Sequence, residues 1–356
     1  MTHRQSDPLT SACKLKIGIL YNLPAEASKG ESIDYLAEAE VKEEAETVRK
    51  ALEILDFHYQ MFPIKDDVEP VIKALKDFKP TVVVNLCEGA FGDSQQEMNV
   101  PAILELLGIP YTGSPPLSLG ICQNKGLTKQ ILEVNGVPTP RYCILNRFED
   151  WRGRMKYPLF VKPLKEDASL GISRRSYVRN EDELKAQVEY VNKRYGQPAL
   201  VEEYIRGREL NVAILGNDDP KVLPISEITF EFEEEPKIVD YRAKWVKESE
   251  EYRKTIPVCP TDLDEKVKRK VERVALKAYK ALYCRDYARI DIRLRNASPL
   301  VLEVNPNPDV SLEGGFARSV RAAGIPYEEF VRQIVFFALE RDRRKHNPWR
   351  LRYLHE

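Results

Sequence analysis

Two short runs of alternating apolar and polar residues near the carboxyl end constrain the fold of this chain more than any other feature. They are ARIDIRL at 288–294 and LVLEVN at 300–305, with a turn-like segment between them. Successive side chains of a strand point to opposite faces, so Arg289, Asp291 and Arg293 are expected on one face and the isoleucines between them on the other. The pattern therefore predicts an antiparallel hairpin with one apolar and one polar face.

The polar face of this hairpin is expected to bring two carboxylates and an amide together. If the hairpin folds symmetrically about Ala297, Asp291 lies across from Glu303 and Arg289 lies across from Asn305. Opposed like charges destabilise a sheet, so a positive group is expected between the carboxylates. Oxygen ligands on a rigid ladder favour Mg²⁺ with phosphate over zinc. A hairpin with one solvated polar face remains the alternative. On the second run the residues expected to share one face are Val301, Glu303 and Asn305.

The rest of the chain is long enough for more than one core. Its 356 residues predict two or three domains. The formal net charge of −1 at pH 7 indicates neither a nucleic-acid coat nor an acidic tail. No apolar run approaches the length of a membrane span, and residues 1–12 lack the apolar region of a signal peptide. A cytoplasmic protein is expected.

Cysteine and histidine usage narrows the possible chemistry. The six cysteines are scattered without CxxC spacing, as expected of reduced thiols rather than a disulfide framework or a zinc site. There are only four histidines, and three lie near the termini, which argues against a histidine-based centre. Any catalysis must therefore use lysine, arginine, acids and a metal.

The first part of the chain alternates strands and helices. Strands are predicted at 14–21, 59–64 and 81–86, with an amphipathic helix over 39–55 and another through 71–78. This order is typical of a small parallel α/β unit, and we expect that domain to span 1–117.

The segment NLCEGAFGD at 85–93 follows the carboxyl end of a predicted strand. Open α/β sheets usually bind ligands at this edge, so Glu88 is a candidate contact for a substrate ammonium group. An ordinary loop acid is the alternative, and the sequence alone favours it.

A second domain is expected over 118–205 and a third over 206–356. The strand YPLFVKP at 157–163 carries Lys162 and precedes the loop at 164–173, whose small and polar residues suit a cover over phosphates. No GxxxxGK[ST] is present, so the loop is not a P-loop. The segment ALVEEYIRGRELNV at 199–212 is expected to cross between domains and offer backbone groups to a planar base, with Glu209 near a ribose. An exposed strand end followed by a glycine turn is the alternative.

Together these motifs resemble the ATP-grasp superfamily and, within it, the D-alanine–D-alanine ligase family. The resemblance covers nearly everything from 85 to 338 and rests on the order and spacing of PAILELLGIPYTGS, NK at 124–125, YPLFVKP, ASLGIS, LVEEYIRGRELNVAIL, DYRAKW, ARIDIR and LEVNPNP. It implies three α/β domains with ATP between the second and third. It also implies that a carboxylate is joined to an amine through an acyl phosphate, and that the protein is a homodimer.

The resemblance also implies a role for each residue that matches a family motif. The residues that bind the nucleotide phosphates would be Lys125, Lys162 and Lys244. The adenine-binding segment would be Glu202, Glu203, Tyr204 and Ile205, with Glu209 binding the ribose. The magnesium ligands would be Asp291, Glu303 and Asn305. The catalytic group would be Arg289, as the oxyanion stabiliser, with Lys244 and Ser169.

The sequence departs from the family mainly where the amino acids bind. The early serine-and-glutamate signature is missing, and NLCEGAFGD replaces the histidine–glycine motif. Ala168 stands where the family has serine, and Trp245 where it has tyrosine. The acids that remain as candidates for the first substrate are Glu40, Glu43 and Glu44.

Three functions follow from this comparison of motifs. The first is an ATP-dependent carboxylate–amine ligase acting on amino acids or small carboxylic acids other than a pair of D-alanines. The second is a true D-alanine–D-alanine ligase with an unusual pocket. The third is a catalytically weak nucleotide-binding sensor, against which the full set of phosphate lysines and metal acids argues.

Overall fold

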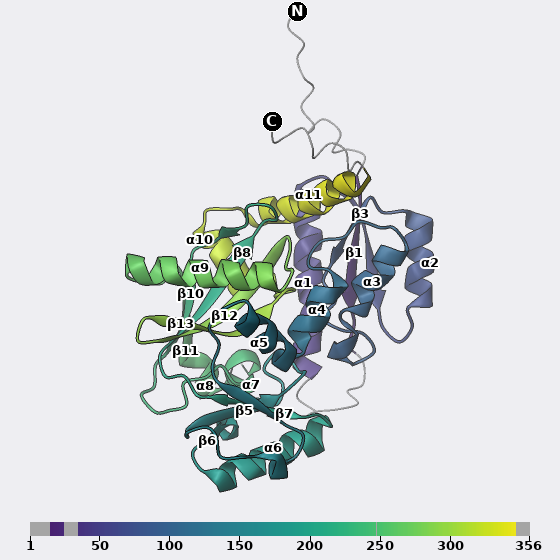
Figure 1. The fold of residues 1–356 in the computed structure, drawn as a ribbon. Helices are drawn as coiled ribbons and strands as arrows, with labels where there is room; N and C mark the ends of the chain where they lie inside the picture. The colour runs from purple at the N-terminus through teal and green to yellow at the C-terminus, as the bar shows by residue number, and fades with distance from the viewer. Residues whose placement is uncertain (1–14, 25–34, 247, 347–356) are drawn as a thin grey trace, which may run out of the picture.

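A computed structural model of the chain describes residues 15–24, 35–246 and 248–346, and it contains three β-sheets (Figure 1). The strands of each sheet fall within one of the three ranges expected from the sequence. The predicted α/β class is therefore confirmed, while the domain boundaries stay a prediction. In this described part of the chain no helix is sufficiently long and apolar to span a bilayer.

The N-terminal unit is a three-stranded parallel sheet flanked by helices. Its elements are β1 (Lys16–Asn22), α1 (Tyr35–Ile54), β2 (His58–Ile64), α2 (Glu69–Phe78), β3 (Val82–Asn85), α3 (Asn99–Leu106) and α4 (Pro116–Gln123). The strand order is β2-β1-β3, so β1 and β3 pair in parallel through the crossover that contains both α1 and α2. Every residue of the central strand β1 after Lys16 is buried, as expected for a strand covered on both faces.

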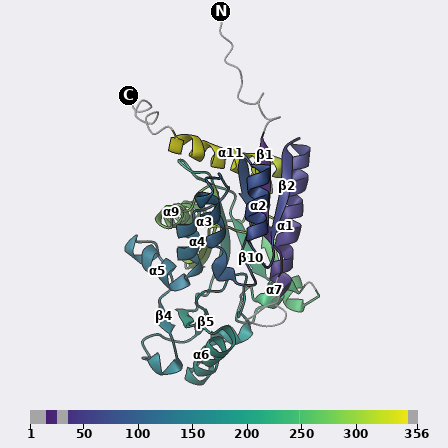
Figure 2. The same ribbon diagram turned by 90° about the vertical axis from the view of Figure 1, so that its right-hand side faces the viewer.

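The central unit is a four-stranded antiparallel sheet with one long helix against it. Its elements are α5 (Lys125–Val134), β4 (Tyr142–Leu145), β5 (Leu159–Pro163), β6 (Tyr177–Val178), α6 (Glu181–Tyr195) and β7 (Ala199–Glu203). The strand order is β4-β7-β5-β6. Figures 1 and 2 place this sheet and α6 at one end of the molecule.

The third unit is the largest and contains the predicted hairpin. Its elements are β8 (Arg208–Leu215), β9 (Lys221–Val222), β10 (Ser226–Phe230), α7 (Tyr241–Trp245), α8 (Glu250–Arg253), β11 (Thr255–Val258), α9 (Glu265–Ala281), β12 (Tyr287–Arg295), β13 (Ser298–Asn305), α10 (Gly315–Ala322) and α11 (Tyr327–His346). The strands run in the order β11-β10-β8-β12-β13, with β9 paired to β8.

The first and third units share one hydrophobic core. Residues of β1, β3 and α1 pack with residues of α10, α11 and the start of β12. Tyr287 lies between Phe316 and Phe330, with ring centroids 5.7 and 6.1 Å away. Because this core is continuous, the N-terminal sheet is held firmly against the sheet that carries the hairpin.

The hairpin pairing predicted at the polar face is confirmed. In β12 and β13, Asp291 pairs with Glu303 and Arg289 pairs with Asn305. The opposite face, which includes Ile290 and Ile292, packs in the core beneath α9. The hairpin therefore separates a buried apolar face from a polar face, as the alternation predicts.

The turn and the second strand differ from the prediction in detail. The strands are joined by a two-residue turn, Asn296 and Ala297. Their positive φ angles of 47° and 62° match a type I′ turn, whose backbone twist agrees with the right-handed twist of the strands. A β-bulge then leaves Leu302 without a partner, and this extra residue restores the pairing of Glu303. The expectation that Val301 shares the face of Glu303 was wrong, because the bulge turns Val301 into the core.

Candidate active site

The Asp291 carboxylate lies at the centre of the hairpin's polar face. Arg289 donates two hydrogen bonds to it, from Nε to Oδ1 at 2.8 Å and from Nη2 to Oδ2 at 2.9 Å. Asn305 donates to Oδ2 at 3.0 Å, and Asn211 on the neighbouring β8 donates to Oδ1 at 2.7 Å. Arg289 is therefore a positive group of the kind expected beside Asp291 and Glu303.

Glu303 is surrounded by positive charge. The Nζ atom of Lys162 lies 3.9 Å from its Oε2 atom. Burial raises the pKa of the Glu303 carboxyl, but the positive charges of three lysines and Arg289 outweigh burial and lower the pKa to about 2. These lysines are Lys125, Lys162 and Lys244. Glu303 therefore stays ionised at every physiological pH.

The donor set on the hairpin suits a hard divalent cation that shares its shell with phosphate. Among residues 15–24, 35–246 and 248–346 no group of three or more His, Cys, Asp or Glu side chains is arranged to hold a metal by itself. Asp291, Glu303 and Asn305 supply only two carboxylates and one amide. Mg²⁺ typically binds in this way, through one or two carboxylates and the phosphates of its substrate.

Two lysines hold the buried carboxylate of Glu202. Lys162 lies 2.9 Å from Oε2, and Lys129 forms an ion pair with Oε1. Lys129 also donates to Thr139 at 2.7 Å. Burial would raise the pKa of Glu202, but both lysines lower it below its usual value. The ammonium group of Lys162 therefore lies between two carboxylates, that of Glu202 and that of Glu303.

Lys129 is a site residue that we did not predict. Its side chain is only 1% exposed, and burial lowers the pKa of its ammonium group. The sequence contains one usable signal, since Lys129 follows Lys125 by four residues on the same helix. Residues with that spacing lie on one face of a helix. Since Lys125 was predicted to lie at the site, Lys129 could have been predicted to face the site too.

Lys125 binds two residues of the loop at 164–173. Its ammonium group donates to Asp167 Oδ1 at 2.6 Å and to the carbonyl oxygen of Glu166. The Glu166 carboxylate accepts from Gln197 at 2.7 Å and from Ser94 at 3.3 Å. The loop therefore contacts both the N-terminal unit and the central unit.

The remaining predicted catalytic residues are Ser169, within this loop, and Lys244, on α7. Ser169 donates its hydroxyl to the carbonyl of Val239 at 3.2 Å and does not line the cavity. Lys244 on α7 does line the cavity. The side chain of Trp245 lies outside the described residues.

The predicted base-binding segment leads into a network centred on Arg293, which we did not predict. Arg293 donates to Glu209 at 3.1 Å and to the carbonyl of Ile205 at 3.0 Å. Its guanidinium lies 5.5 Å from the ring centroid of Tyr204. Glu203 instead pairs with Arg295 at 2.6 Å. The sequence placed Arg293 on the polar face, but its partner Glu209 is contributed by β8.

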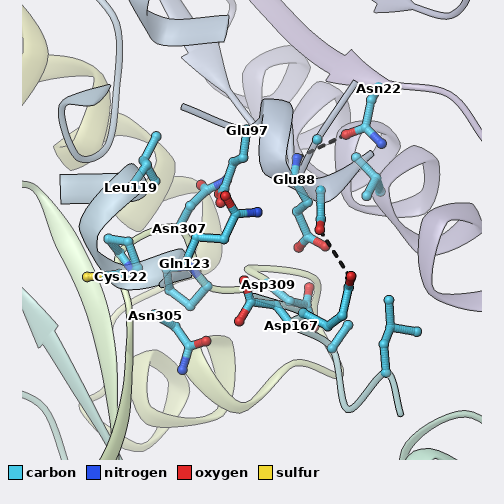
Figure 3. A pocket seen from close by; sticks show the side chains of 18 of the residues that line it. Asn22, Glu88, Glu97, Leu119, Cys122, Gln123, Asp167, Asn305, Asn307 and Asp309 are labelled. Carbon is cyan, nitrogen blue, oxygen red and sulfur yellow. Dashed lines mark hydrogen bonds between the residues drawn. The ribbon is translucent and has the colours of Figure 1, made fainter. Parts of the chain in front are cut away.

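A cavity of about 150 Å³ opens beside the end of the hairpin (Figure 3). Its wall combines the loop after β3, the end of α4, the loop at 164–173 and the segment after β13. Arg289, Lys244 and Asn305 line it, and so do Glu88 and Glu97. The structure thus places Glu88 in a cavity wall, where its backbone N–H donates to Asn22 at 3.0 Å. Glu97 was not predicted.

Of the acids considered for the first substrate, Glu43 and Glu44 do not form part of this wall. Glu43 is exposed on α1, whereas Glu44 is buried and accepts a hydrogen bond from the backbone N–H of Val310 at 2.7 Å. The side chain of Glu40 lies outside the described residues. Glu44 therefore supports the segment that follows the hairpin.

Comparison with known proteins gives consistent similarities. The family model described as D-ala D-ala ligase C-terminus matches residues 131–336. A D-alanine–D-alanine ligase from Thermotoga petrophila is 33% identical over 82% of this chain and 89% of its own length. An uncharacterised protein of Sinorhizobium fredii, y4sG, is 36% identical over 73% of this chain and 75% of its own. The crystal structure of D-alanine–D-alanine ligase from Bacillus anthracis complexed with ATP covers 93% of this chain and 99% of that one, with 26% identity and a TM-score of 0.73.

Proposed function

The chain belongs to the D-alanine–D-alanine ligase family and has its ATP-grasp fold, and from this premise we propose how its residues divide the reaction between them. The chain is an ATP-dependent ligase. A carboxylate resists attack by an amine because oxide is a poor leaving group. In the proposed reaction a carboxylate oxygen attacks the γ-phosphorus of ATP and ADP leaves. The amine nitrogen then attacks the carbonyl carbon, and phosphate leaves as the nitrogen loses a proton.

Lysines would compensate the charge of the nucleotide phosphates. Lys125, Lys162 and Lys244 are the three proposed phosphate ligands. Their positive charges all act on Glu303, so they gather at one place beside the hairpin. Asp291, Glu303 and Asn305 would hold Mg²⁺, which supplies further neutralisation of the transferring phosphoryl group.

The adenosine part of ATP would lie against the segment that joins the central and third units. Glu202, Glu203, Tyr204 and Ile205 would contact the base, and Glu209 the ribose. Arg293 supports this region by binding Glu209 and the carbonyl of Ile205. We assign Arg293 a positioning role, since it fixes the groups that would face the nucleoside.

Arg289 would stabilise the negative charge that develops on the carbonyl oxygen. It lines the cavity, and its two bonds to Asp291 use Nε and Nη2. Nη1 is then the nitrogen positioned to donate to the substrate. A single well-placed donor of this kind typically contributes about 3–4 kcal/mol to a transition state.

The loop at 164–173 would keep water away from the acyl phosphate. The contacts of Lys125 with Glu166 and Asp167 hold it over the cavity. Ser169 would act through the loop rather than on the reacting atoms, because its hydroxyl binds Val239.

We further propose substrates other than two D-alanines. Ala168, which lines the cavity, and Trp245 replace a serine and a tyrosine of the family. Alanine offers no hydrogen bond and tryptophan offers one donor and no acceptor, so the polar network of the family cannot form in the same way. Relative to the family, the residues proposed to contact the amino-acid substrates (the amino-acid side) are thus altered, while those proposed to bind the phosphates and Mg²⁺ (the phosphate side) are retained.

The observation that carries this proposal is the convergence of Lys125, Lys162, Lys244 and Arg289 on Glu303, where Lys244 and Arg289 also line the cavity. The test is ADP release at saturating ATP and Mg²⁺ with a panel of D- and L-amino acids and small carboxylic acids. We expect a pair that greatly outperforms D-alanine. D-alanine as the best substrate on both sides would refute the altered pocket, and no turnover with any pair would refute the ligase assignment.

Two further expectations come from the family and the sequence. A homodimer is proposed and is tested by sedimentation velocity. A cytoplasmic location is proposed from the cysteines, of which Cys87, Cys122, Cys143, Cys259 and Cys284 are free thiols.

A further inference from the structure

We propose that Gln123 is a specificity-determining residue whose side-chain amide donates a hydrogen bond to an uncharged oxygen in the side chain of an amino-acid substrate. This inference rests on the proposed function, which places the amino-acid substrates in the cavity. It adds the chemical class of one substrate, an amino acid whose short side chain carries a hydroxyl, ether or amide oxygen, and it names the residue that selects this class.

Gln123 is a buried residue of the cavity wall. It is the last residue of α4, its side chain is 7% exposed, and it lines the cavity. Figure 3 shows this side chain extending from α4 into the cavity. Its Nε2 atom is buried and has no hydrogen-bond partner among the described residues. Since a buried donor normally has an acceptor, an oxygen atom of a bound ligand is expected at this nitrogen.

The other side-chain amides of the wall already form hydrogen bonds within the protein. These amides belong to Asn22, Asn305 and Asn307. Asn307, for example, donates to the carbonyl oxygen of Cys87 at 3.0 Å and to Glu97 at 3.2 Å. In the part of the chain that the structure describes, the Gln123 nitrogen forms no bond of this kind, so it is available to a ligand.

The neighbours of Gln123 on α4 are apolar. Leu119, one turn earlier, and Cys122 are both buried, and both line the cavity. A substrate group that lies against this wall is therefore expected to consist mainly of carbon. One oxygen on that group would pair with the amide, as in ligand pockets where a few polar groups fix the orientation of a largely apolar ligand.

The face of α4 that carries Gln123 is turned toward the start of α3. Gly120 precedes Gln123 by three residues, and residues with this spacing lie on one face of a helix. Gly120 packs against Met98, since a Cβ atom at position 120 would lie 2.6 Å from the Met98 Sδ atom. Glu97, the residue before Met98, lines the same cavity. The ligand oxygen at Gln123 is thus expected close to this acid.

The surroundings of Glu97 disfavour a further negative charge. Burial and the negative charges of Asp167 and Glu88 raise the pKa of Glu97 well above its usual value. They outweigh the hydrogen bond from Asn307 and the positive charge of Lys125, which act in the opposite direction. A substrate carboxylate at this wall would meet the same opposition, whereas a hydroxyl, ether or amide oxygen carries no charge.

This difference in charge assigns the oxygen to the substrate's side chain. The α-carboxylate of an amino acid is charged, and the carboxylate that reacts has its own proposed partners, Arg289 and Mg²⁺ at the hairpin. An uncharged oxygen of an amino acid lies in its side chain. The cavity volume of about 150 Å³ is similar to that of a cavity that holds benzene, so this side chain is expected to be short.

The test compares substrates that differ mainly in the side-chain oxygen, in the ADP-release assay at saturating ATP and Mg²⁺. The pairs are O-methylserine with norvaline and serine with 2-aminobutyrate, each as D and L forms. Because the isostere leaves a buried donor unpaired, we expect kcat/KM to be at least about ten-fold higher for the oxygen-bearing member. O-methylserine is the sharper probe, since its ether oxygen accepts a hydrogen bond and cannot donate one. Asparagine should likewise exceed aspartate, whose side-chain oxygens are charged.

Variants then assign the preference to Gln123. Gln123→Met keeps the length of the side chain and removes the amide, so it should reduce the preference for O-methylserine over norvaline to about one. Over the same comparison kcat/KM for norvaline should stay unchanged or rise. Gln123→Leu is measured alongside, so that poor folding of one variant does not decide the result.

Gln187 on α6 provides a matched control. It is also buried, and its Nε2 atom also has no partner among the described residues, but it does not line the cavity. Gln187→Met should therefore preserve the preference. Each enzyme is also given an equal mixture of O-methylserine and norvaline, and the incorporation of each is counted by mass spectrometry. The ratio of the two counts gives the ratio of kcat/KM values independently of the fraction of folded enzyme.

The outcomes separate this inference from the proposed function. Equal kcat/KM for O-methylserine and norvaline in the wild type would overturn the inference and leave a ligase of other substrates. A preference that persists in both Gln123→Met and Gln123→Leu would also overturn it, and so would a higher kcat/KM for aspartate than for asparagine. Absence of ATP turnover with every substrate would instead refute the proposed function, and the inference with it.

Discussion

Removing the Glu202 carboxylate should destabilise the protein strongly. Glu202 is 3% exposed, and its two partners, Lys129 and Lys162, are 1% and 5% exposed. Glu202→Gln keeps the shape of the side chain but leaves the buried ammonium group of Lys129 without its carboxylate partner and Lys162 with only the more distant carboxylate of Glu303. Breaking a buried ion pair in this way costs about 3–5 kcal/mol. For a chain of this size we expect the Tm to fall by about 5–10 °C.

The pH dependence of this effect has a definite sign. The two lysines lower the pKa of Glu202 although burial opposes them. The folded protein therefore binds the proton less tightly than the unfolded chain, whose carboxyl has a pKa of about 4.3. The stabilisation is complete above that value and is lost as the pH falls through the folded pKa. The difference in Tm between wild type and Glu202→Gln should accordingly be constant near pH 7 and shrink under acidic conditions.

The adjacent residue provides a matched control for stability. Glu203 pairs with Arg295 at 2.6 Å, but the two side chains are 33% and 43% exposed. Exposed ion pairs contribute about 0–1 kcal/mol, so Glu203→Gln should change the Tm by no more than about 2 °C. Calorimetry of wild type and both variants between about pH 2 and pH 8 is the measurement. If Glu202→Gln and Glu203→Gln melted together at pH 7, the buried cluster would not stabilise the fold as described.

Three other predictions test the site directly. Asp291→Ala or Glu303→Ala should lower Mg²⁺-dependent turnover by at least about 100-fold with an unchanged circular dichroism spectrum, because each removes a proposed hard ligand; near-normal turnover would refute the metal assignment. The loop at 164–173 should be cleaved by protease more slowly with ATP, Mg²⁺ and substrate than without them, and equal rates would contradict its covering role. Arg293→Met should raise KM for ATP about ten-fold while kcat changes little, since Glu209 and the carbonyl of Ile205 lose their donor. Arg269→Met, which removes an exposed arginine of α9, should leave that KM unchanged.

The sequence predicted the elements whose patterns are local. The parallel N-terminal unit, the hairpin and the pairing of Asp291 with Glu303 all follow from alternation and spacing over a few residues. The bulge was not predictable, because it depends on which valine of β13 fits the core beneath α9. The hairpin turns between Asn296 and Ala297, half a residue before the predicted centre at Ala297. The bulge adds one residue to β13, so beyond it Asp291 pairs with Glu303 as predicted.

The residues that sequence reasoning missed act through partners far away in the chain. Arg293 pairs with Glu209 because β8 and β12 are neighbouring strands with those two residues in register. Lys129 is a fully buried lysine, a rare situation that composition makes improbable without a known counter-charge. Such contacts are decided by tertiary packing, which the local pattern does not specify.

The way the two halves of the site meet explains how the substrate can change while the chemistry is kept. The phosphate side is built on paired strands, where a substitution would disturb the ladder between Asp291 and Glu303. The amino-acid side is built largely from the loop after β3 and the end of α4, which tolerate change because neither supports that ladder. Asn307 joins the two, since it donates to the carbonyl of Cys87 at 3.0 Å and to Glu97 at 3.2 Å. Glu97 is therefore held at a fixed position relative to the hairpin, so that under the proposed function a substitution in this wall would alter specificity without rebuilding the catalytic centre.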